Sequence, residues 1–215
     1  MRTVRDILRN SVFVLTSDLL VRFSSAILFI LVARKLGEAA AGVYTIAGTY
    51  MQIFASLAFW GLDQLLIRDV SQNRTQGGKL WINLGLLRLG LTLLVILLIE
   101  MPLLMLSSYS QNTVRAIFLM GLTLLPDSLH NISRAYFVAV EELAYVSLTS
   151  LVLAILRLAG ALVVFLQGRV SVESVIWVLL AASVGRAFIS SRFVLRKLGA
   201  DDLDVNPTFW LRSIK

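Results

Sequence analysis

The sequence predicts an all-α protein, a polytopic membrane bundle of six transmembrane helices. Hydrophobic residues make up 58% of its 215 residues and charged residues only 15%, whereas a soluble domain is nearer half apolar and a quarter charged. The mean hydropathy is +0.82. The apolar residues also fall in continuous blocks long enough to cross a bilayer, which takes about 20 residues per helix.

Six apolar segments follow one another along residues 1–199, and each is predicted to be a helix because isolated strands leave backbone groups unpaired in lipid. The first contains Asp18 and Arg22 and is too long for the apolar region of a signal peptide, so we expect it to remain as an uncleaved span. In chain order the spans cover about residues 11–33, 40–62, 80–106, 114–140, 143–166 and 175–195.

The predicted connections are short and polar. A tight turn is expected at 34–38, the most polar loop at 63–79, and a turn at Glu141-Glu142. Residues 200–215 are expected to form a polar linker and the start of an amphipathic or seventh segment. With the N-terminus inside, the cytoplasmic side would carry eleven Lys and Arg residues and the opposite side four. This bias predicts that both termini are cytoplasmic in a multi-pass protein of the bacterial or archaeal (inner) cell membrane.

Several classes of function are disfavoured by composition. The chain has no cysteine and a single histidine, His130, which excludes a thiolate or multi-histidine metal centre. No nucleophile and base occur in a catalytic arrangement, so we expect neither an enzyme nor a bound cofactor. The net charge of +7 is dispersed among apolar segments and does not indicate a nucleic-acid partner.

Five arginines lie inside the predicted spans, where each costs roughly 2.5–3.5 kcal/mol near the middle of a helix. The acids available at similar depth are Asp18, Asp127 and Glu100, so at least two arginines are left without one. Arginine is always charged and its planar fork suits phosphate. The five residues are Arg22, Arg88, Arg134, Arg157 and Arg186.

Polar residues recur at helical spacing around these arginines. Asp18 and Arg22 are four residues apart on one face, the favourable order for an ion pair, and Pro126 beside Asp127 predicts a kink. Polar stripes usually face a bundle interior or pore. The candidate cavity-lining set is therefore Asp18, Arg22, Arg88, Asp127, His130, Asn131, Arg134, Arg157 and Arg186. Ion pairs or hydrogen bonds that only join helices are the alternative interpretation.

The segment from Ala33 to Arg74 resembles the N-terminal part of the polysaccharide-biosynthesis flippases, the O-antigen and capsule translocases of the multidrug/oligosaccharidyl-lipid/polysaccharide exporter superfamily. The resemblance rests on an Ala-Arg-x-Leu-Gly turn, a Gly followed by an aromatic, a Gly-Leu and a basic segment. These motifs lie at Ala33, Arg34, Leu36 and Gly37, at Gly42 and Tyr44, at Gly61-Leu62, and at Arg68. The charged Arg22 in the first span is also similar.

The resemblance implies a transporter that moves an oligosaccharide linked to polyprenyl pyrophosphate between leaflets by alternating access. It implies two six-helix lobes around a cationic cavity, lined on this side by Arg22 and the fourth and fifth spans, with Asp18 or Asp127 as a candidate for ion coupling. The expected partners are that lipid-linked substrate, membrane lipids, and a second lobe or a second copy of the chain.

The chain corresponds to one lobe, so we expect it to be inactive as a monomer. It would be either a natural half-protein or a truncation. Two alternatives stay open from sequence: a non-transporting fragment or membrane assembly partner, and a drug or cation antiporter lobe. The antiporter is disfavoured because its cavity would favour acids over arginines.

Overall fold

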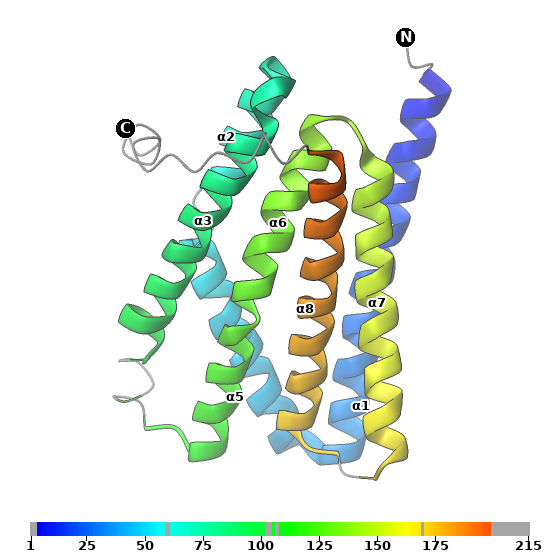
Figure 1. Ribbon diagram of the computed structural model, residues 1–215. Coiled ribbons are helices and arrows are strands. Elements are labelled where there is room, and N and C mark those ends of the chain that lie inside the picture. The colour runs from blue at the N-terminus through cyan, green and yellow to red at the C-terminus, as the bar shows by residue number, and fades with distance from the viewer. Residues whose placement is uncertain (1–3, 59–60, 102–104, 106–107, 169, 199–215) are drawn as a thin grey trace.

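In the computed structural model, residues 4–58, 61–101, 105, 108–168 and 170–198 are described, and every regular element within these ranges is helical. The all-α membrane bundle predicted from sequence is confirmed. The start of α1 and the end of α8 lie at the same end of the bundle (Figure 1). The elements are α1 (Val4–Ala58), α2 (Leu62–Gln72), η1 (Arg74–Gln76), α3 (Gly77–Val95), the π-helical turn η2 (Ile96–Glu100), α5 (Gln111–Leu122), α6 (Leu124–Ala139), α7 (Leu143–Leu166) and α8 (Val172–Lys197).

The helix α1 contains two of the predicted spans and bends sharply at Gly37. Gly37 has φ 84° and ψ 178°, a conformation that glycine adopts without a steric penalty. Figure 1 shows the first arm descending to the foot of the bundle and the second arm climbing back behind α5. Gly37 therefore separates two helical arms, and the tight turn predicted at 34–38 is confirmed.

Four helical stretches of the described chain are long and apolar enough to cross a membrane: Val12–Ala58, Arg74–Leu98, Leu143–Leu166 and Val172–Lys197. The first of them, with 47 residues, contains the bend at Gly37 and hence two predicted spans. The fourth predicted span is divided into α5 and α6, which are 12 and 16 residues long and follow each other end to end (Figure 1). Pro126 lies in the first turn of α6, where its missing N–H is tolerated.

The prediction of a polar loop at 63–79 is wrong. Helix α2 occupies Leu62–Gln72, and α3 already begins at Gly77. Leu62, Leu66 and Val70 recur every four residues and are all buried, so they form one apolar face that α6 and α3 cover. The polar residues between them lie on the other face of an amphipathic helix.

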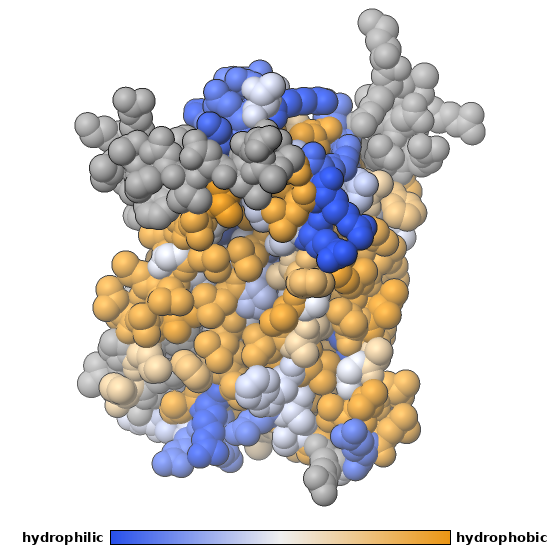
Figure 2. Space-filling view, in the orientation of Figure 1, coloured by the Kyte–Doolittle hydropathy of each residue, from blue (hydrophilic) through white to orange (hydrophobic). Residues whose placement is uncertain are grey.

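The outer surface of the bundle is apolar at mid-height. Figure 2 shows a broad hydrophobic belt with hydrophilic residues gathered at both ends. Exposed leucine, isoleucine, valine and phenylalanine side chains contribute to this surface from α1, α3, α7 and α8. A soluble protein rarely exposes so large a continuous apolar area, so the belt fits a surface covered by lipid or by other membrane-embedded helices.

Close contact between α7 and α8 depends on two glycines. A Cβ atom added at Gly160 would lie 2.6 Å from Val178 Cγ1, and one added at Gly185 would lie 2.9 Å from Leu156 Cδ1. Small residues allow membrane helices to approach closely, where dispersion forces hold them together. The two glycines therefore set the register of the pair.

We expect Gly160→Ala to destabilise the protein by about 1–3 kcal/mol, because the β-branched Val178 cannot turn away without moving the helix. The measurement is unfolding of the purified protein in detergent. Gly90→Ala is the matched control, because a Cβ there meets no atom within 4 Å. Equal effects of the two substitutions would contradict close packing at Gly160.

Candidate functional site

An ion pair joins α6 to α8 in the interior. Arg186 Nη2 donates to Asp127 Oδ1 at 2.7 Å, and the two side chains are only 13% and 11% exposed. Helix α8 packs against both α6 and α7, which brings Asp127 and Arg186 together although 59 residues separate them. Sequence reasoning included both residues among the cavity-lining candidates but did not pair them.

Arg157 lies beside this pair. The contact between Gly185 and Leu156 places the two following residues, Arg186 and Arg157, at the same level of the bundle. Arg157 Nη1 donates to Ser25 Oγ of α1 at 3.0 Å, and the charges of Arg186 and Asp127 both act on Arg157. Among the described residues it forms no ion pair.

The contact between α1 and α7 is a polar seam. Ser150 Oγ donates to Asp18 Oδ1 at 3.5 Å, about two turns of α1 from the bond between Arg157 and Ser25. Asp18 forms no ion pair with Arg22 in the part of the chain that the structure describes, although the i, i+4 spacing would have allowed one.

Arg88 is paired with Asp63, which the sequence predicts to lie in a polar loop. The side chain of Arg88 is 0% exposed, and its Nη1 donates to Asp63 Oδ1 of α2. The four-residue spacing of Leu62, Leu66 and Val70 could have indicated this pair. It predicts a helix with one buried face, and Asp63 follows directly after the first residue of that face. Arg88 therefore has a structural partner and is less free for a ligand than the sequence suggested.

His130 is buried between charged residues. It is 2% exposed, its Nδ1 has no hydrogen-bond partner in the described structure, and the charges of Arg186, Arg134 and Arg88 act on it. His130 lies on α6 one turn after Asp127, so it extends the same polar site along that helix.

Two candidates are exposed, Arg22 and Arg134, and the described structure gives neither of them an ion pair. Asn131 is half-buried, as are Asp18, Arg157 and Arg186. The structure thus brings Asp127, His130, Arg157 and Arg186 together in the interior, and leaves Arg22 and Arg134 on the surface. Glu100 lies outside the residues whose side chains are described.

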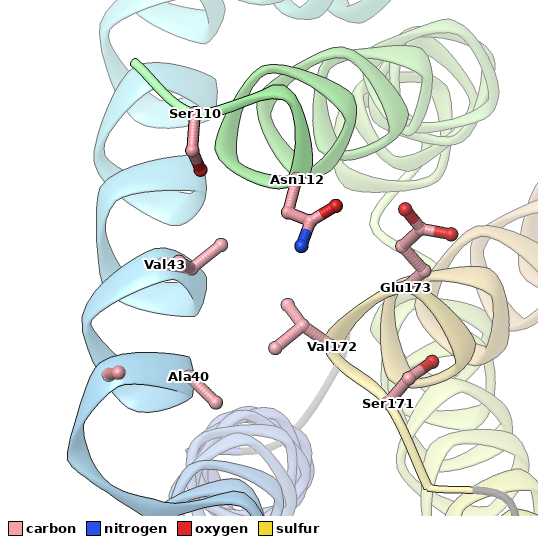
Figure 3. A pocket seen from close by; sticks show the side chains of 8 residues that line it. Ala40, Val43, Ser110, Asn112, Ser171, Val172 and Glu173 are labelled. Atoms are coloured by element: carbon pink, nitrogen blue, oxygen red, sulfur yellow. The ribbon is translucent and has the colours of Figure 1, made fainter.

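A separate cavity of about 440 Å³ lies at the foot of the bundle, between α1, α5 and α8 (Figure 3). Figure 3 shows Asn112 and Glu173 facing this space, with Val43 on the opposite wall. None of the predicted site residues lines it. The described residues also contain no cluster of three or more metal-ligating side chains.

These features define a class: an α-helical membrane protein with arginines at membrane depth and no metal-binding cluster among its described residues. The family model described as "Polysaccharide biosynthesis protein" matches residues 7–215. The chain belongs to this family, as the resemblance around Ala33 to Arg74 implied. Comparison with curated proteins and with solved structures found no match.

Proposed function

We propose that the chain is one lobe of a flippase that moves a lipid-linked oligosaccharide across the cytoplasmic membrane by alternating access. The proposal is supported by the family, whose role is polysaccharide biosynthesis at a membrane, and above all by Arg22. This cation is exposed on α1 among exposed Leu15, Leu19 and Phe23, and no acid within the described ranges is paired to it.

An unpaired arginine in contact with lipid at mid-helix is costly. The face of α1 that carries Arg22 is therefore better covered by a water-filled cavity and a second lobe than by lipid. A diphosphate group in that cavity would satisfy the guanidinium fork. Arg157 on the neighbouring α7 bonds to Ser25, one turn from Arg22, so the two cations flank the seam between α1 and α7.

In this proposal the substrate carries a polyprenyl pyrophosphate. The second lobe is a separate polypeptide, a second copy of the chain, or a further part of the same protein. Both termini are cytoplasmic. The count of Lys and Arg residues supports that orientation. Arg134 and Asn131 remain candidates for the cavity wall, whereas Arg88 is assigned to the pair with Asp63.

The test is rescue of surface-polysaccharide export in cells lacking their own flippase, with and without a co-expressed second lobe. We expect the chain alone to fail and the combination to succeed. Arg22→Ala with Arg157→Ala should reduce export to about a tenth or less, because each charge-assisted bond to a phosphate is worth roughly tenfold or more. Lysine at both positions should restore part of it.

The control is Arg74→Ala, an exposed arginine of η1, with the amount of each variant in the membrane measured by immunoblot. Unchanged export by the double alanine variant at normal abundance would contradict the proposal. Failure with every second lobe would favour the non-transporting fragment instead.

A further inference from the structure

The interior cluster of Asp127, His130, Arg157, Ser183 and Arg186 carries more positive charge than its acid can balance. It holds two guanidinium groups and one carboxylate, and that carboxylate is bound to Arg186. Among the described residues, Arg157 donates only to the neutral hydroxyl of Ser25. A buried excess charge is unfavourable unless a counter-ion or a polar ligand compensates for it.

The same cluster contains several buried polar atoms that have no partner in the described structure. They come from three helices: His130 Nδ1 on α6, Arg157 Nε on α7, and Ser183 Oγ and Arg186 Nε on α8. His130 and Ser183 are 2% and 1% exposed. Leaving such groups unsatisfied costs about 1–3 kcal/mol each, so they indicate that something accepts hydrogen bonds from them.

The side chains of Arg186 and Asp127 are only 13% and 11% exposed, so a ligand beside this pair has to be compact. The charge to be balanced is one. We infer that the interior cluster binds one small monovalent inorganic anion, of the chloride class, between α6, α7 and α8.

This anion would bridge Arg157 and Arg186, while Ser183 and His130 contribute neutral hydrogen bonds. It would hold α7 and α8 to α6 at the level where Gly185 meets Leu156. The inference does not depend on transport, because it follows from the charges inside the lobe.

The test compares thermal unfolding of the purified full chain in detergent, in sodium chloride and in sodium gluconate at equal ionic strength. We expect the unfolding temperature to rise saturably with chloride or bromide, and not with gluconate or sulfate. Broadening of the chloride NMR line by the protein provides a direct measure of binding.

Arg157→Gln should weaken chloride binding by about tenfold or more, the equivalent of one charge-assisted hydrogen bond, and Ser183→Ala should weaken it several-fold. Arg115→Gln, at an exposed arginine of α5, should leave it unchanged. If Arg157→Gln fails to fold, the comparison of chloride binding with the unsubstituted protein is made with Ser183→Ala alone.

Equal stability in chloride and gluconate, without line broadening, would overturn the inference. So would unchanged chloride binding in a folded Arg157→Gln or in Ser183→Ala. Stabilisation by sulfate or phosphate but not by chloride would also overturn it and assign the cluster to an oxyanion. None of these readouts measures export, so the outcome is distinct from that of the flippase proposal.

Discussion

Replacing Asp127 with alanine is expected to lower the free energy of unfolding by about 3–5 kcal/mol, the cost of breaking a buried ion pair on one side. Arg186, whose side chain is 13% exposed, would keep its charge without its carboxylate partner. The excess positive charge of the interior cluster would rise from one to two. The measurement is reversible unfolding of the purified protein in mixed detergent micelles.

A double substitution distinguishes the effect of the lost charge of Asp127 from the effect of its lost packing. Asp127→Leu with Arg186→Met removes both charges and keeps apolar volume, and buried ion pairs replaced in this way often lose little stability. We therefore expect the double variant to be more stable than Asp127→Ala. If both lose the same amount, packing around Asp127 rather than its charge would account for the effect.

The Asp127→Ala variant should also depend more strongly on chloride than the unsubstituted protein, since a second excess charge remains in the cluster. A loss of all chloride dependence in that variant would show that the carboxylate, not the arginines, organises the anion site.

Replacing Asp63 with alanine is expected to cost about 3 kcal/mol. Its partner Arg88 is 0% exposed, whereas Asp63 itself is 37% exposed, so the penalty falls on the buried guanidinium. Asp69, six residues after Asp63 on the same helix α2, provides a matched control. Arg68 and Asp69 also form an ion pair, with side chains 67% and 30% exposed, and such exposed pairs contribute little to stability.

The comparison of Asp63→Ala with Asp69→Ala therefore tests burial with the same residue change on the same helix. The measurement is again the free energy of unfolding in detergent. A loss for Asp69→Ala as large as that for Asp63→Ala would contradict the assignment of Arg88 and Asp63 as a buried structural pair.

The membrane environment and the all-α class could be predicted from composition, because a chain with 58% hydrophobic and 15% charged residues cannot cover a soluble globule. The positions of the five arginines were also predictable, since a charge inside an apolar block is visible without any coordinates. Leu62, Leu66 and Val70 recur every four residues and so indicate the buried face of α2. The many polar residues between them favoured a loop, which is why the helix was not predicted.

Which arginines have partners could not be predicted, because a pair depends on contacts between helices that are distant in the chain. Asp63 reaches Arg88 only because α2 folds against α3, and Asp127 reaches Arg186 only because α8 packs on α6. The outward orientation of Arg22 likewise depends on which face of α1 the other helices cover. The sequence by itself determined how much charge enters the membrane, and the tertiary structure decided which of those charges are neutralised there.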